Sequence, residues 1–151
     1  MEPMIILREG TITEVFDRSE FLEQSRAYCE ESGTKAYGKE NPHREAYLEL
    51  EERGEIRVVV ATRLGQIIGF AFVLKTYHFH FSLPMATIET LWLDKAWRKS
   101  HAGLSLIRYC KSIARDWGYK HLTASAPAGS RLAQVYRRLA THTDDDFVFT
   151  L

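Results

Sequence analysis

The sequence lacks several features that mark particular classes of protein. Among its 151 residues, no apolar run approaches the roughly 20 residues that a membrane-spanning helix needs. The opening stretch MEPMIILREG is too acidic, and its apolar part too short, for a secretory signal. Twenty basic and twenty acidic residues leave no net charge with histidine neutral. This balance argues against a general nucleic-acid binder, since such proteins usually carry a basic excess. We therefore expect one cytoplasmic domain over residues 1–151.

Cysteine and potential metal ligands are also scarce. The two cysteines, Cys29 and Cys110, lie far apart in segments with helical patterns. Such a pair is typical of partly buried thiols in a reducing compartment rather than of a disulfide framework. His78 and His80 alternate in the stretch TYHFHF, but no third or fourth ligand is evident, so no metal site is expected. These histidines could instead line an acceptor pocket or lie at a solvated strand end.

The hydrophobic residues that are present make up 45% of the chain, enough for a sizeable core. Their spacing predicts helices where apolar positions recur every three to four residues, and strands where β-branched residues cluster or alternate. The expected helices cover residues 11–31, 43–53, 103–117 and a segment that begins after Ser130, an N-cap residue. The expected strands cover residues 4–7, 56–62, 67–81, 86–93, 121–126 and 147–151.

The order of these elements indicates a fold class. Three successive strands between residues 56 and 93 are joined by short links, which predicts an antiparallel meander. Strands and helices then alternate to the end of the chain. We expect an α+β fold in three layers, in which helices flank both faces of a mixed, mostly antiparallel central sheet.

The junction WRKSHAGLSLI, residues 97–107, lies between a strand pattern and the clearest helical pattern. The start of a helix leaves backbone N–H groups unpaired and carries partial positive charge, so it favours an anion. Gly103 has no Cβ and lets a ligand approach its backbone, and Arg98 and Lys99 add positive charge. The stretch fits a pyrophosphate site, although a plain helix start with solvated cations has the same features. It matches neither the P-loop G-x-x-x-x-G-K-[ST] nor the dinucleotide fingerprint G-x-G-x-x-G.

The longer stretch ETLWLDKAWRKSHAGLSLI resembles the central signature of the GNAT superfamily of N-acyltransferases. In that family a strand ending in Leu-x-Val is followed by Asp-Pro-x-[Tyr/Trp]-Arg and by a glycine-containing turn into a helix. Here Leu91-Trp92-Leu93 takes the strand positions, Arg98 the basic position and Gly103 the last small position. Lys95 stands where proline is usual, and His101 replaces the middle glycine. The order of expected elements resembles the family along nearly the whole chain, and the similarity is closest to small phage-encoded members.

The resemblance implies a cosubstrate and a site that binds it. Acyl-coenzyme A, above all acetyl-coenzyme A, would supply the acyl group, and no metal is implied. Backbone N–H groups near Leu91, Trp92 and Leu93 would pair with the pantetheine arm and polarise the thioester carbonyl, which requires a bulge or splay in the strand. The turn would hold the pyrophosphate through Arg98, Lys99, Ser100, His101, Ala102, Gly103 and Leu104. His101 could narrow this cradle, donate to a phosphate, or be a plain surface histidine.

Two residues are candidates for the chemistry. Glu89 is a carboxylate in the otherwise apolar strand ATIETLWL, and by the resemblance it occupies the position of a general base, which partial burial would tune for that role. A rim carboxylate paired with a basic neighbour is the alternative. Tyr136, in SRLAQVYRRLA, resembles the tyrosine that serves the family as general acid toward the departing sulfur; the alternative is a core aromatic on an amphipathic helix. Ala140 replaces a usual glycine there, and the usual Gly-Phe pair is missing.

The sequence thus predicts direct transfer of an acetyl group, in a ternary complex, to a primary amine of a small molecule or a protein. Modified nucleotides stay among the conceivable acceptors, no membrane partner is expected, and the protein would be a monomer or homodimer. One alternative is a non-catalytic module of the same fold, such as a virion or regulatory component, which the missing glycine and Gly-Phe pair favour. A nucleic-acid binder would have to use basic helix faces that are more often solvated, namely Arg108, Lys111, Arg115, Arg137 and Arg138.

Overall fold

The protein is described here by a computed structural model that covers residues 4–32 and 36–151, so the first three residues of MEPMIILREG lie outside the described part. The chain divides into two compact units. The first comprises Met1–Arg18 and His43–Ala124, and the second comprises Ser19–Pro42 and Ser125–Leu151. The central sheet and the turn predicted to bind a cosubstrate both belong to the first unit.

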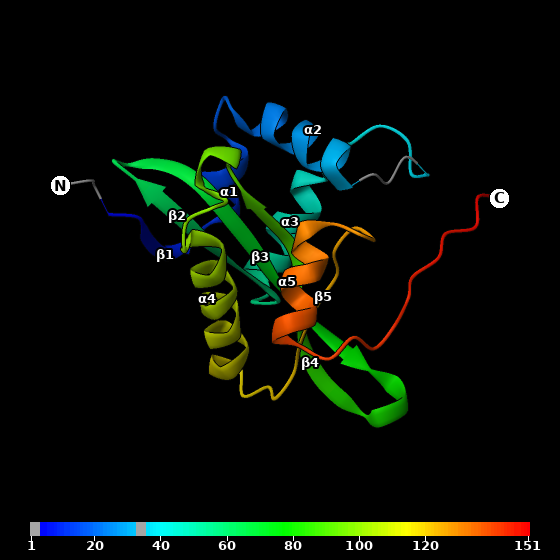
Figure 1. Ribbon diagram of the computed structural model, residues 1–151. Coiled ribbons are helices and arrows are strands. Elements are labelled where there is room, and N and C mark those ends of the chain that lie inside the picture. Colours follow the sequence, from blue (N-terminus) through cyan, green and yellow to red (C-terminus); the bar gives the residue numbers. More distant parts are fainter. Residues whose placement is uncertain (1–3, 33–35) are drawn as a thin grey trace. The chain divides into compact units, whose positions relative to one another are not determined.

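The first unit is built on a five-stranded sheet in the order β1-β2-β3-β4-β5 (Figure 1). Its strands are β1 (Ile6–Gly10), β2 (Ile56–Arg63), β3 (Gln66–His78), β4 (Leu83–Leu93) and β5 (Leu122–Ala124). The first four strands pair antiparallel, and β5 pairs parallel to β4. The expected mixed, mostly antiparallel sheet and its central meander are therefore confirmed.

The β2–β3 connection shows how the sequence produces this meander. Leu64 and Gly65 both have positive φ angles, 51° and 77°. Two such residues form the tight hairpin turn whose twist matches that of the flanking strands. Glycine adopts this conformation at little cost, and Leu64 is carried along by the pairing of Arg63 with Gln66 on either side.

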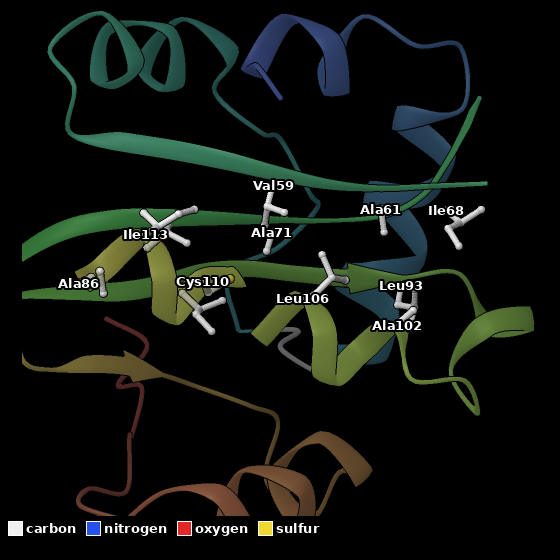
Figure 2. Close-up of a cluster of buried hydrophobic side chains, with 13 residues drawn as sticks. Val59, Ala61, Ile68, Ala71, Ala86, Leu93, Ala102, Leu106, Cys110 and Ile113 are labelled. Carbon is white, nitrogen blue, oxygen red and sulfur yellow. The ribbon is translucent and has the colours of Figure 1, made fainter. Parts of the chain in front are cut away.

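One face of the sheet packs against helix α4 (Ala102–Asp116). Successive side chains of a strand point to opposite faces, so alternate residues of β2 and β3 reach this layer. Figure 2 shows the α4 side chains directed at the strands. The buried cluster includes Val59, Ala61, Ala71, Val73 and Leu93 from the strands, and Leu106, Cys110 and Ile113 from the helix.

The opposite face carries α1 (Ile12–Phe16) and α3 (Arg44–Glu52), whose ribbons lie across the sheet from α4 in Figure 2. Aromatic side chains dominate here. Phe72 lies 6.1 Å from Phe16 and 5.4 Å from Tyr47 between ring centroids, and Phe70 stacks on Trp92 at 5.5 Å. Helices on both faces were expected, and the first unit confirms this arrangement.

Helices α2 (Phe21–Ser32) and α5 (Arg131–Leu139) belong to the second unit. Ser130 caps α5 as expected, because its Oγ accepts from the backbone N–H of Ala133 at 3.1 Å. An ion pair joins Arg26 of α2 to Glu40 at 3.3 Å. None of the helices in the described ranges is both long and apolar enough to cross a membrane.

Two expected elements are wrong. The single helix over 11–31 is broken into α1 and α2: α1 ends at Phe16, and Asp17, its C-cap, forms a two-pronged ion pair with Arg44, at 2.9 Å to each oxygen. The expected strand over 147–151 is not formed: this segment has no regular structure, and Phe147 and Phe149 are exposed. High strand propensity alone does not supply a pairing partner.

Smaller differences affect element ends. The strand expected over 67–81 ends at His78, and the 3-10 helix η1 (Phe79–Phe81) follows. His80 therefore lies in η1 rather than alternating with His78 along a strand, with 6.3 Å between the two ring centroids. In the described ranges no three His, Cys, Asp or Glu side chains gather as a metal site would require.

Candidate active site

A β-bulge interrupts β4 at Glu89. Along the β3–β4 pairing, Val73 faces Ile88 but the next residue, Phe72, faces Thr90. Glu89 is therefore an extra residue with no pairing partner in β3. A bulge of this kind shifts the alternation of side chains by one place. Ile88 before the bulge and Leu93 after it consequently reach the same core against α4, although an odd number of positions separates them.

Beyond the bulge, one edge of β4 has no strand beside it. The parallel pairing with β5 covers only Ala86–Ile88, and no other described strand pairs with residues 89–93 on that side. At the end of the strand, the Asp94 N–H donates toward β3, to the Ile68 carbonyl at 2.8 Å. Backbone N–H groups alternate sides along a strand, so those of Leu91 and Leu93 face the open edge. The pantetheine contact predicted from the sequence requires a bulge or splay in the strand, and the bulge is present at Glu89.

The carboxylate of Glu89 is exposed and accepts two hydroxyl hydrogen bonds. The phenolic O–H of Tyr47 donates to Oε1 at 2.8 Å, and the Thr90 O–H donates to Oε2 at 2.6 Å. The expected partial burial of Glu89 is therefore wrong, since its strand position lies at the rim. In the described part of the chain no basic side chain forms an ion pair with it, so the alternative of a charge-paired rim carboxylate does not apply.

The contact between Tyr47 and Glu89 could not be found from the sequence. The tyrosine and the glutamate are separated by 42 positions, and no local motif links them. Only the packing of α3 on the aromatic face of the sheet brings the two side chains together.

The turn between β4 and α4 begins with the 3-10 helix η2 (Lys95–Trp97), capped by Asp94, whose Oδ1 accepts from the Ala96 N–H at 2.9 Å. Ser100 then accepts from the Ala102 N–H at 3.2 Å through its Oγ. The first hydrogen bond of α4 runs from Ser105 to the His101 carbonyl. The N–H groups of Gly103 and Leu104 therefore have no acceptor within the helix, as at any helix start.

His101 and Gly103 differ from what their family positions suggest. His101 adopts φ −75° and ψ −2°, a right-handed conformation open to any residue, and its exposed side chain does not cap the helix. A glycine is not needed there for backbone reasons. At Gly103, a Cβ would meet only Leu93 Cδ2 at 3.8 Å, an ordinary contact. The protein itself leaves room for a side chain at Gly103.

Positive charge surrounds this turn. Arg98 is half-buried and its Nε donates to the Leu93 carbonyl at 2.8 Å, while Lys99 is exposed. A further cation, which the sequence did not indicate, comes from the end of β2: the Arg63 guanidinium lies 4.6 Å from the centre of the Trp97 ring. Such a site favours a polyanion.

Three other residues singled out in the sequence, Trp92, Tyr136 and Cys110, differ in burial and in the unit to which they belong. Trp92 is buried and points to the aromatic face, so only its backbone belongs to the open strand. Tyr136 is half-buried on α5, in the second unit, whereas all the other candidates belong to the first. Cys110 is buried in the core against the sheet, and burial raises the pKa of its thiol to about 12.

Comparison with known proteins identifies the family. The model of the Acetyltransferase (GNAT) family matches residues 20–140. Among solved structures, an aminoglycoside acetyltransferase from an uncultured soil metagenomic sample is 18% identical with a TM-score of 0.74, covering 97% of this chain and 96% of that one. A ribosomal-protein-alanine N-acetyltransferase from Brucella melitensis biovar Abortus 2308 is 15% identical with a TM-score of 0.72, covering 97% and 99%.

A third solved structure contains the cosubstrate. It is a predicted acetyltransferase with acetyl-CoA from Clostridium acetobutylicum, 12% identical with a TM-score of 0.75, covering 97% of this chain and 95% of that one. Comparison with curated proteins gave no match. At these identities the solved structures establish the shared fold, and the family model establishes membership. The chain belongs to the GNAT family of acetyltransferases, and it is an enzyme of the class expected from its sequence, an N-acetyltransferase.

Proposed function

We propose that this protein, acting as a single domain, transfers an acetyl group from acetyl-coenzyme A directly to a primary amine within a ternary complex. The observation that carries the proposal is the bulge at Glu89. It places an exposed carboxylate beside the open edge of β4, in the same unit as the α4 start. A proton acceptor for the amine, donors along the strand edge for the pantetheine arm and an anion site for the pyrophosphate are three of the parts that such a reaction uses, and a proton donor for the departing thiolate is the fourth.

The β4–α4 turn supplies the cosubstrate site. The N–H groups of Leu91 and Leu93 would pair with the pantetheine arm, whose amides are donors and acceptors spaced along an extended chain. The backbone N–H groups of Gly103 and Leu104 would hold the pyrophosphate at the start of α4, and Ser100, His101 and Ala102 would form the turn around it. Arg63 and Lys99 add long-range attraction, and Arg98 fixes the turn against the strand.

The proton transfers can then be assigned. The amine nitrogen attacks the thioester carbonyl carbon, so a C–N bond forms and the carbonyl electrons move to oxygen. Glu89 takes the proton that the nitrogen loses, directly or through water, and becomes a carboxylic acid. The tetrahedral intermediate collapses, the C–S bond breaks, and the thiolate receives the phenolic proton of Tyr136. Solvent returns a proton to the phenolate and removes the one held by Glu89.

Cysteine chemistry supports direct transfer over an acyl-enzyme. A thiolate is the nucleophilic form of cysteine. Cys110 is buried in the core and burial raises the pKa of its thiol to about 12, which disfavours the thiolate. Burial also raises the pKa of Cys29. Neither residue has the environment of an activated nucleophile.

The alternative of a non-catalytic module loses one of its two supports. It rested partly on His101 in place of a glycine, yet that backbone position is open to any residue.

The amine acceptor is a small molecule or a protein. The named solved structures include an aminoglycoside acetyltransferase and a ribosomal-protein-alanine N-acetyltransferase, so an aminoglycoside and a protein N-terminus are the first acceptors to try.

Two measurements test the proposal. Calorimetric titration with acetyl-coenzyme A should show binding, and failure to bind would overturn it. Release of free coenzyme A thiol should then be followed against sisomicin, a peptide with an N-terminal alanine, lysine and a polyamine. Turnover with one of them that Tyr136→Phe reduces and Glu89→Gln nearly abolishes supports the mechanism. Binding without turnover on any amine would favour the module instead.

A further inference from the structure

The proposed base is held by a residue from a different element. Glu89 stands on the bulge of β4, and the hydroxyl that reaches its Oε1, at 2.8 Å, belongs to Tyr47 on α3. Thr90 donates to the other oxygen, Oε2, at 2.6 Å. Thr90 is the next residue in the chain and moves with the bulge, whereas Tyr47 fixes the carboxylate relative to the rest of the unit.

The ring of Tyr47 packs against two aromatic rings that also pack against each other. Its centroid lies 5.2 Å from that of Phe16 on α1 and 5.4 Å from that of Phe72 on β3. Because Phe72 is buried and these rings are tilted against one another, the tyrosine has little freedom to swing away. Its hydroxyl therefore meets Glu89 at a fixed place.

The helix that carries Tyr47 is anchored to its neighbour. The backbone N–H of Ile12 donates to Glu51 Oε2 at 2.8 Å, near the end of α3. Near its start, Arg44 contacts both oxygens of Asp17 at 2.9 Å. These contacts fasten α3 to α1 at both ends, so the position of the Tyr47 hydroxyl is determined by the fold rather than by the glutamate.

An exposed glutamate without such a contact would sample several rotamers, and ordering it during the reaction would cost conformational entropy. We infer that Tyr47 is a positioning residue for Glu89: its hydroxyl holds the carboxylate in one orientation and remains protonated throughout. Each carboxylate oxygen keeps a second lone pair, so the proton from the amine can still be accepted. This inference rests on the proposed function of Glu89 as the base.

The kinetic test uses Tyr47→Phe, which removes the hydroxyl and keeps the ring contacts. We expect kcat to fall about 10-fold or more, since small misplacements of a catalytic group carry such costs. KM for acetyl-coenzyme A should stay within about twofold, because the turn that binds it is untouched. Tyr109→Phe on α4 is the matched control and should keep wild-type kcat. In a Glu89→Gln background, Tyr47→Phe should cause no further loss.

Three results would overturn the inference. One is an unchanged kcat in Tyr47→Phe. Another is a loss of kcat on Tyr47→Phe that is as large in the Glu89→Gln background as in the wild type, which would show that the tyrosine acts independently of Glu89. The third is a large drop in melting temperature beside the kinetic loss, which would make Tyr47 a structural residue only.

A structural test needs no acceptor and so separates this inference from the proposed function. Crystal structures of the wild type and of Tyr47→Phe should show the Glu89 carboxylate in one position in the former and spread over several in the latter. If the wild type acetylates none of the amines, the proposed function fails, yet the comparison still decides whether Tyr47 orders the glutamate. A carboxylate in the same place in both crystals would refute the role of Tyr47.

Discussion

The Nε of Arg98 donates a hydrogen bond of 2.8 Å to the carbonyl oxygen of Leu93. The bond joins the last residue of β4 to the turn that leads into α4, and so fixes the direction in which the start of the helix points. Arg98 was expected as a direct cosubstrate ligand. In this geometry its side chain joins the β4–α4 turn to the strand, whereas Lys99 is exposed.

Replacing these two cations should therefore have different effects on stability. Arg98→Met leaves a partly buried carbonyl without its charged donor and should lower the free energy of unfolding by about 1–3 kcal/mol. Lys99→Met removes the same charge from an exposed site and should change stability by less than about 0.5 kcal/mol. Urea unfolding measures both. Equal stabilities would show that the Arg98–Leu93 bond contributes nothing.

Glu89→Gln keeps the size of the side chain and removes its ability to accept a proton. Turnover should fall by about 10²–10⁴-fold, the usual contribution of general base catalysis. Calorimetry should give an unchanged affinity for acetyl-coenzyme A, since the strand edge and the helix start are intact. Activity near the wild-type level would remove Glu89 from the mechanism.

Gly103→Ala separates folding from cosubstrate binding. A Cβ there meets only Leu93 Cδ2 at 3.8 Å, and alanine is the better helix former by about 1 kcal/mol, so the melting temperature should hold or rise. The proposed pyrophosphate site needs a close approach to the Gly103 backbone, so the affinity for coenzyme A should fall. A variant that binds coenzyme A as well as the wild type would place the pyrophosphate elsewhere.

Gly69→Ala is the matched contrast for this experiment. Its Cβ would lie 2.9 Å from the Trp92 carbonyl oxygen and 2.9 Å from Leu93 Cδ1. Backbone cannot move aside cheaply, so this variant should lose about 1–3 kcal/mol of stability. The two glycines thus serve opposite purposes, one a close approach between strands and the other space beside the helix start.

Cys110 should act as a reporter of unfolding. Its thiol is buried, and burial raises its pKa to about 12, so it should not react with a disulfide reagent at neutral pH while the protein is folded. The half-buried Cys29 should react first. Counting thiols with and without denaturant checks this, and rapid labelling of both in the native state would contradict the packing of α4.

Stability should depend on pH through Arg8 and Glu14. The hydrogen bond from Arg8 lowers the pKa of Glu14 below its ordinary value of 4.5, with a backbone bond from Thr11 adding to the effect. A carboxyl with a depressed folded pKa stabilises the protein above its unfolded pKa, and the gain is lost as pH falls through the folded value. Arg8→Gln should thus be less stable than the wild type near pH 7, and the difference should shrink near pH 3. A difference independent of pH would assign the effect to packing.

The parts of the fold that could be predicted are those set by local spacing. The apolar repeat of α4, the hairpin at Leu64-Gly65 and the runs of β-branched residues depend on near neighbours, and the sequence shows those directly. The break after α1 lies beside a contact that local spacing cannot show, the pairing of Asp17 with Arg44, 27 residues away. The segment 147–151 has the composition of a strand, but pairing depends on residues that composition does not reveal.

The candidate site divides in the same way. The turn before α4 could be located because the residues that form it are contiguous in the chain. The bulge could not, since it arises from the register between two strands, and neither strand alone shows an extra residue. The contact between Tyr47 and Glu89 is hard to predict for two reasons. Glu89 lies on a bulge that depends on the strand register, and Tyr47 lies on a helix 42 positions earlier in the chain.

The bulge in β4 makes Glu89 a residue that the sheet itself does not need. Thr90 already faces Phe72 and Leu93 already faces Gly69, so deleting Glu89 would leave each later residue opposite the same partner in β3 and on the same face. Ile88 and Leu93 would both stay in the core, because an even number of positions would then separate them in a regular strand. Neither the pairing nor the core thus constrains position 89, and what stands there is left to be selected for what it does at the exposed rim.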